Sequence, residues 1–233
     1  MVFGMKTMPF LFALSALAAP AAAAERRYSV TDFDRVQVDG PFEVTLATGG
    51  ASLASAVGDQ GAIDLVALDV QGRTLRIRPN ISAWSGKGTA PGTVRITLST
   101  RDLRGATVIG AGSLAIDRVR GLRFDLSLSG SGSLSVGSAD ADTMILASVG
   151  SGSIRVGGKA KQLRLTADGS GDFDGRAFVT EDAQIAASTS GAITVGAART
   201  AKVAARGRGP VEILGSPACT LTGQAAAMVR CGK

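Results

Sequence analysis

The chain has 233 residues, 45% of them apolar and 4% aromatic, and its formal net charge is +6. It contains no histidine, which excludes nucleophile triads built on histidine and metal sites built on imidazole. With a single tryptophan and a single tyrosine, the chain lacks the aromatic rings on which bases stack, so we expect no nucleic-acid partner.

The first 24 residues have the pattern of a secretory signal peptide. One positive charge, Lys6, precedes an apolar run from Met8 to Ala19, and small residues follow up to Ala24. This order predicts cleavage before Glu25 and a periplasmic or secreted mature protein. The alternative, a membrane anchor, needs about 20 consecutive apolar residues, and Pro20 interrupts the run too early.

Residues 25–233 are expected to form one all-β domain, because no change of composition marks a boundary within them. In residues 25–100, alternating apolar and polar residues predict strands of less regular coils. The segments with this pattern are Phe33–Gly49, Thr74–Asn80 and Thr93–Thr100. Only Ala51–Leu68 is compatible with a short helix, and a loop rich in Gly, Ser and Pro is expected at Ser82–Gly92.

From residue 101 onward, G-x-G motifs recur with a period close to 20 residues. Their second glycines are spaced by 20, 20, 19, 20 and 18 residues, at Gly112, Gly132, Gly152, Gly171, Gly191 and Gly209. A flexible linker has no reason to keep a period, whereas a stack of similar coils does. We expect each of these glycines to lie in a sharp turn at positive φ, a conformation that costs glycine little.

Apolar residues stand at fixed distances from each of these glycines. The first column, six residues before the glycine, is Ala106, Leu126, Leu146, Leu165, Ile185 and Val203. The second, two residues after it, is Leu114, Leu134, Ile154, Phe173, Ile193 and Val211, and the third, four after it, is Ile116, Val136, Val156, Gly175, Val195 and Ile213. The two-residue period predicts strand, corner, strand and a looser third side in each coil. The predicted fold class is therefore an all-β, single-stranded parallel β-helix.

A last unit fits after Val211, with Leu221, Val229 and Cys231 in the three columns. Cys219 stands eight residues before the corner, at the inward-facing position of Phe124, Met144 and Leu163 in earlier units. In a chain routed to an oxidising compartment, a disulfide between Cys219 and Cys231 is the default expectation. Two buried free thiols are the alternative.

Several segments occur in a characteristic order: FDRVQVDGPFEVTLATG, LRIRPN, the repeated GSGSLSV and GSGSIRV, and a final VRCGK. In these segments the chain resembles the head GIN domain family, known as putative autotransporter adhesins, over Tyr28–Lys233. The resemblance implies a right-handed β-helix acting at the cell surface or in the periplasm. It brings no established catalytic residues.

The densest carboxylate group is DGSGDFDG, in which Asp168, Asp172 and Asp174 surround a glycine corner. A bent loop of this kind could hold Ca²⁺, because hard cations bind several carboxylate and carbonyl oxygens. The segment occurs once, however, whereas calcium-binding β-roll motifs recur about every nine residues. We expect a solvated corner with local hydrogen bonds instead, and no cofactor.

Two functional interpretations remain open. β-Helices carry polysaccharide lyases and hydrolases, for which Asp125, Arg155 and Asp174 are outward-facing candidates, but fold analogy is weak support for an activity. We favour a non-enzymatic protein that adheres or binds at the cell envelope, to anionic polysaccharide or an envelope protein. The arginines that would contribute, or serve solubility alone, are Arg73, Arg76, Arg78, Arg118, Arg120, Arg123, Arg206 and Arg208.

Overall fold

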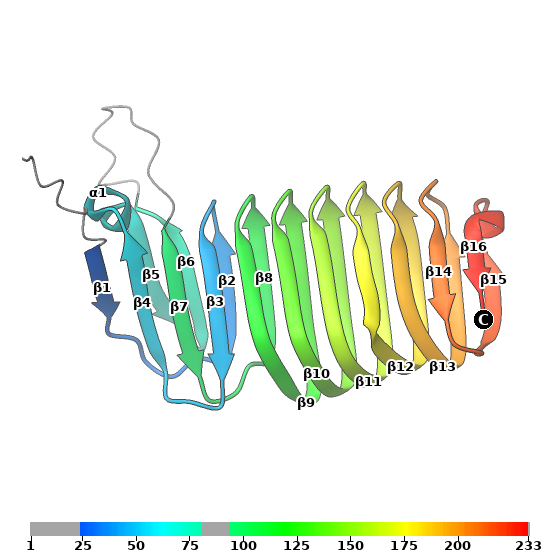
Figure 1. Ribbon diagram of the computed structural model, residues 1–233, viewed down its shortest axis with the longest axis horizontal. Coiled ribbons are helices and arrows are strands. Elements are labelled where there is room, and N and C mark those ends of the chain that lie inside the picture. Colours follow the sequence, from blue (N-terminus) through cyan, green and yellow to red (C-terminus); the bar gives the residue numbers. More distant parts are fainter. Residues whose placement is uncertain (1–23, 81–93, 233) are drawn as a thin grey trace, which may run out of the picture.

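Long strands, each bent once near its middle, build the regular part of the structure, a computed structural model that describes residues 24–80 and 94–232 (Figure 1). The predicted loop Ser82–Gly92 and all of the predicted signal peptide except Ala24 lie outside the described residues. The bent strands are β9 (Ser113–Gly130), β10 (Ser133–Gly150), β11 (Ser153–Gly169), β12 (Phe173–Thr189) and β13 (Ile193–Ala205). Each is parallel to the next and paired with it, as a β-helix requires.

Each bent strand contributes to two broad sides of the stack (Figure 1). Its first half lies on one side, called face A here, and its second half returns along the other, face B. The looser third side predicted from the sequence is absent from β10 and β11, because pairing continues through the bend, from Ala139 with Gly158 to Ala141 with Ala160. The coil is therefore a flattened two-sided loop.

The predicted apolar columns are confirmed as ladders in the core. Leu126, Leu146 and Leu165 pair in register on face B, and all are at most 2% exposed. The one gap in the third column, Gly175, has a packing reason. A Cβ there would lie 2.8 Å from Cε1 of Phe173, so the large ring of Phe173 fills the space that a valine side chain occupies in other coils.

The two glycines of each G-x-G motif have different roles. Positive φ occurs at the first glycine of four motifs, for example +122° at Gly130, but not at Gly207, and Thr189 takes this place before Gly191. The second glycines, Gly132 and Gly152 among them, have no positive φ. The expectation of a positive φ there was wrong. A Cβ at Gly152 would instead overlap the carbonyl oxygen of Gly132 in the preceding coil. The second glycine is needed because successive backbones approach closely at the corner.

The N-terminal strands do not stack in chain order. The coil of β2 (Arg35–Asp39) and β3 (Glu43–Thr48) lies between β6 (Thr74–Pro79) with β7 (Arg95–Thr100) on one side and β8 (Gly105–Gly110) with β9 on the other, all parallel. Antiparallel strands cover the outer end: β1 (Ala24–Tyr28) and β4 (Leu53–Gly58) on face A, and β5 (Val66–Gln71) on face B. A short helix, α1 (Gln60–Asp64), lies within the segment where the sequence allowed one.

Buried Asp34 holds this order of strands. Its carboxylate accepts a 2.7 Å hydrogen bond from Arg73 and lies 3.7 Å from Arg104. Its backbone N–H donates to the carbonyl of Arg73, and its own carbonyl accepts from the N–H of Arg104. Because Arg73 precedes β6 and Arg104 precedes β8, one residue ties β2 to both neighbours.

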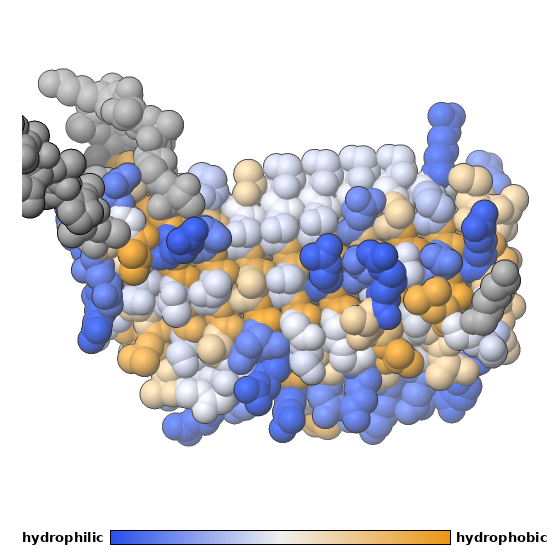
Figure 2. All heavy atoms as spheres, viewed as in Figure 1, coloured by the Kyte–Doolittle hydropathy of each residue, from blue (hydrophilic) through white to orange (hydrophobic). Residues whose placement is uncertain are grey.

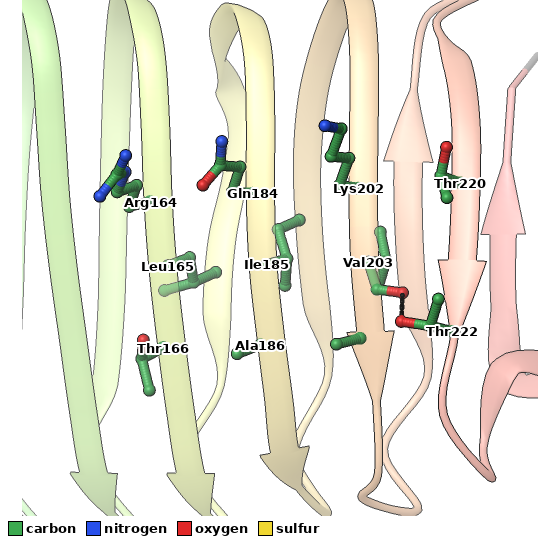
Figure 3. A pocket seen from close by; sticks show the side chains of 11 residues that line it. Arg164, Leu165, Thr166, Gln184, Ile185, Ala186, Lys202, Val203, Thr220 and Thr222 are labelled. Atoms are coloured by element: carbon green, nitrogen blue, oxygen red, sulfur yellow. Dashed lines mark hydrogen bonds between the residues drawn. The ribbon is translucent and has the colours of Figure 1, made fainter.

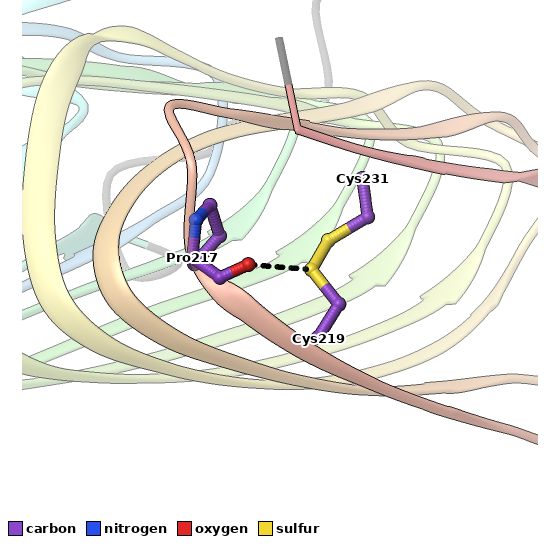
Figure 4. The surroundings of a disulfide bond; sticks show 3 residues. All are labelled: Pro217, Cys219 and Cys231. Atoms are coloured by element: carbon purple, nitrogen blue, oxygen red, sulfur yellow. Dashed lines mark hydrogen bonds between the residues drawn. A yellow bond between two sulfur atoms is a disulfide. The ribbon is translucent and has the colours of Figure 1, made fainter.

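The C-terminal coil consists of β14 (Val211–Leu214), β15 (Ala218–Thr222), a 3₁₀ turn η2 (Ala226–Met228) and β16 (Val229–Cys231). The predicted register is confirmed, since Val203 pairs with Leu221 and Val211 with Val229. Cys219 on face B and Cys231 on face A have Cα atoms 6.6 Å apart, with their sulfur atoms joined across the coil (Figure 4). Cys219 is exposed rather than buried, because no described strand pairs with β15 on its outer side.

Replacing Gly152 by alanine should destabilise the protein, because the new Cβ would collide with the backbone of the preceding coil. Overpacking of this kind costs about 1–3 kcal/mol, or about 2–4 °C of melting temperature per kcal/mol. Thermal unfolding followed by circular dichroism measures it. Gly61→Ala is the matched control, since a Cβ at Gly61 meets nothing within 4 Å. Equal melting temperatures for Gly152→Ala and the unmodified protein would refute the role given to coil contact.

Replacing both Cys219 and Cys231 by serine should lower the melting temperature. The bridge closes a loop over a sequence separation of 12, for which the chain-entropy estimate is about 3 kcal/mol. Thiol titration of the denatured protein gives an independent measurement. We expect no reactive thiol before reduction and two after it, so two thiols without reductant would contradict the bridge.

Candidate binding surface

The two edges of the stack differ in charge (Figure 2). The corners present mainly serine and glycine, and form the pale upper edge in this view. The bends carry charged side chains along the lower edge, and many are paired between successive coils, as in Lys161 with Asp142 at 2.8 Å and Arg199 with Asp182. Charges that neutralise one another in this way leave little attraction for a ligand.

The three aspartates of the calcium candidate do not converge. Asp168 lies on β11 in face B, whereas Asp172 accepts a 2.7 Å hydrogen bond from the backbone N–H of Ala192. Asp174 lies on face A between Arg176, at 2.8 Å, and Arg155, at 3.3 Å. In the described ranges 24–80 and 94–232, no three His, Cys, Asp or Glu side chains gather as a metal site would require.

The residues of the enzyme alternative also separate. Arg155 and Asp174 lie on face A, but Asp125 belongs to the second half of β9 on face B, where Arg123 binds it at 2.9 Å. Hydrogen bonds from Arg176, and then from Arg155, hold the pKa of Asp174 well below its usual range. A carboxylate held ionised in this way is a poor proton donor, and these three residues do not form one catalytic site.

Face B carries a shallow groove, called the face-B trough here. Two cavities of about 330 and 520 Å³ lie along it, the first over β2, β6, β8, β9 and β10 and the second over β11, β12, β13 and β15. Nine strands at a spacing of about 4.8 Å give it a length of about 40 Å. It runs along the stack, across the strands.

Two rows of outward-facing residues, each in register from strand to strand, define the trough. The charged row is Thr74, Arg35, Gly105, Asp125, Ile145, Arg164, Gln184, Lys202 and Thr220. The floor row is Arg76, Gln37, Thr107, Ser127, Ala147, Thr166, Ala186, Ala204 and Thr222. From Thr107 onward the floor row has only small side chains, so an extended chain could approach the sheet closely.

The C-terminal half of the trough has unpaired positive charge (Figure 3). Arg164, Gln184 and Lys202 lie in one line across successive strands, and both cations are exposed. Neither Arg164 nor Lys202 makes a salt bridge with any described residue. In the N-terminal half, Arg35 reaches over Gly105 to within 3.8 Å of Asp125, so the cation there is partly neutralised.

Sequence reasoning missed Arg164, Gln184 and Lys202, because it grouped arginines that are close in the chain. Three of the eight arginines it chose bind aspartates outside the two rows: Arg73 binds Asp34, Arg78 binds Asp69, and Arg118 pairs with Asp117 near the bend. The signal that could have identified these three residues is their common position relative to the corner glycines. The charged row stands seven residues before each second glycine, directly before the first apolar column.

No helix in the described segments is long and apolar enough to cross a membrane.

A search of curated proteins found no match. Solved structures with a similar fold include a protein named a putative adhesin from Bacteroides fragilis. It is 20% identical in sequence, the match covers 91% of this chain and 95% of that chain, and the TM-score is 0.80. Another, named a putative lipid binding protein, is from Parabacteroides distasonis. It is 19% identical, the match covers 92% of this chain and 97% of that chain, and the TM-score is 0.68. A third, a putative adhesin from Parabacteroides merdae, has 13% identity over 91% and 96%, with a TM-score of 0.64.

At these identities the similarity shows a shared fold. Residues 32–217 match the family described as "Putative auto-transporter adhesin, head GIN domain", which spans the strands from β2 to the end of β14. The chain therefore belongs to the head GIN domain family.

Proposed function

We propose that this protein is a non-enzymatic binding module of the cell envelope, and that its face-B trough binds an extended anionic polysaccharide. The proposal includes removal of the predicted signal peptide and action in the periplasm or outside the cell. Its main support is the pair of exposed, unpaired cations, Arg164 and Lys202, on the lip of a groove about 40 Å long. The adhesin names of the family and of similar folds agree with such a role.

The shape of the trough favours a long ligand over a small one. The cavities are shallow depressions on a sheet, not enclosed pockets, and their residues repeat from strand to strand. A ligand on such a surface gains contacts in proportion to its length, because each coil adds a similar set of side chains. Thr166, Thr220 and Thr222 add hydroxyl groups that can donate and accept hydrogen bonds with sugars.

A second candidate ligand, an anionic lipid headgroup, is suggested by the name of the Parabacteroides distasonis protein. A headgroup would use the same cations. It would not use the length of the trough, and the small floor residues offer no large apolar side chains to enter a bilayer. Polysaccharide is therefore the ligand we propose, and vesicles become part of the test.

Replacing Arg164 and Lys202 together by glutamine should weaken binding of hyaluronan or polygalacturonate by about fivefold to tenfold, since an exposed charge contact contributes about 0.5–0.7 kcal/mol. Isothermal titration calorimetry at low ionic strength measures the affinity, which should fall as salt is added because exposed charges are screened. The matched control is Arg120→Gln with Arg208→Gln. Both residues are exposed, lie off the trough and form no salt bridge within the described ranges, so the net charge changes equally.

Three outcomes would contradict the proposal. Affinity of the control variant could fall as much as that of the trough variant, which would make the effect one of net charge. Vesicles of anionic lipid could bind while both polymers do not, which would identify the headgroup as the ligand. New reducing ends or unsaturated products in the polymer would show that the protein is an enzyme.

A further inference from the structure

The charged row of the face-B trough carries its charges on alternate strands. Arg35, Asp125, Arg164 and Lys202 stand on β2, β9, β11 and β13, and each intervening strand contributes an uncharged residue. Two strand spacings separate neighbouring charges by about 10 Å. Asp125 is the one acid of the row and lies near Arg35, so Arg164 and Lys202, two strands apart, are the cations that a polyanion can reach.

Like charges on adjacent strands repel each other, which is one reason to place charged residues on alternate strands only. The bends of the same coils, however, solve that problem in another way. There, Lys161 of one coil pairs with Asp142 of its neighbour, and Arg199 with Asp182, so opposite charges alternate from coil to coil. An acidic residue between Arg164 and Lys202 would have done the same, and would have neutralised both cations.

Gln184 stands between these cations instead. Its side chain is exposed, it is in register with Arg164 and Lys202, and it lies in line with them (Figure 3). An amide both donates and accepts hydrogen bonds, which suits the hydroxyl groups of an uncharged sugar. This arrangement keeps both cations available and places a neutral polar group midway between them.

We propose that the trough prefers polyanions with one negative charge per two sugars, and that Gln184 is the residue that determines this preference. The inference rests on the proposed function, because it concerns the ligand of the same site. A pyranose unit in an extended chain advances by about the spacing of one strand. Two carboxylates on alternate sugars can therefore face Arg164 and Lys202 while the neutral sugar between them faces Gln184.

A polymer charged on every sugar has a further carboxylate on the sugar that lies over Gln184. That carboxylate finds no cation there, and Asp168 lies on the opposite side of the floor row, on the same strand as Arg164. The extra charge therefore gains no ion pair at this position. Such a polymer should bind less tightly than its higher charge density would suggest.

The test compares oligosaccharides of equal length at fixed ionic strength. Hyaluronan has one carboxylate per disaccharide and polygalacturonate has one on every sugar. The unmodified protein should bind the hyaluronan fragment more tightly, and Gln184→Lys should shift the affinity ratio toward polygalacturonate by about threefold or more, the scale of one exposed ion pair. Gln224→Lys is the matched control, since this exposed residue lies outside both rows, and it should leave the ratio unchanged.

The outcomes separate this inference from the proposed function. If neither oligosaccharide binds, the proposed function fails. The preference is refuted if both oligosaccharides bind and the unmodified protein binds polygalacturonate as tightly as hyaluronan or more tightly. It is also refuted if Gln184→Lys and Gln224→Lys give the same affinity ratio. In both cases the proposed polysaccharide site is retained. Melting temperatures of both variants should match that of the unmodified protein, because both glutamines are exposed.

Discussion

Close contact between successive backbones at the corners is the constraint on which the rest of the structure depends. In each regular coil the last glycine of the corner lies so near the coil before it that even a methyl group would overlap a carbonyl oxygen, as at Gly132 against Gly112. The corner also carries hydrogen bonds between coils, such as that from Gly152 N–H to the carbonyl of Gly130 at 2.9 Å. Because every coil meets its neighbour at this point, the register of both faces is set there, and equivalent residues form straight rows.

Because the rows are straight, residues at the same position of the sequence repeat lie side by side, both in the core and on the surface. In the core they produce ladders of one residue type, with local exchanges of volume such as Phe173 beside Gly175. On the surface they place equivalent side chains about 4.8 Å apart, where like charges repel. The protein meets this problem in two ways, by alternating sign at the bends and by alternating charged with neutral residues in the face-B trough. Only the second way leaves charge available to a ligand.

The regular coils could be predicted from the sequence because their information is local. A two-residue apolar period and a glycine every 20 residues or so are visible without any knowledge of distant contacts. The order of the N-terminal strands depends instead on contacts between residues far apart in the chain, such as Asp34 with Arg73 and Arg104. No periodicity encodes those contacts. The closed bend was missed for another reason. The paired segments 139–142 and 158–161 do alternate in polarity, but their inward-facing residues are alanine and glycine, which are depleted in strands and predict them only weakly.

The trough could not be predicted from the sequence for a different reason. Its rows take one residue from each strand, so no single segment of the chain contains them. Arg164 and Lys202 are far apart in the chain, and the basic residues three positions before them, Lys161 and Arg199, belong to the bends, where they pair with aspartates. They become neighbours of Gln184 only once the register is known. In a stacked fold each coil contributes one position to every row, so a binding surface can be altered one position at a time without disturbing the core behind it.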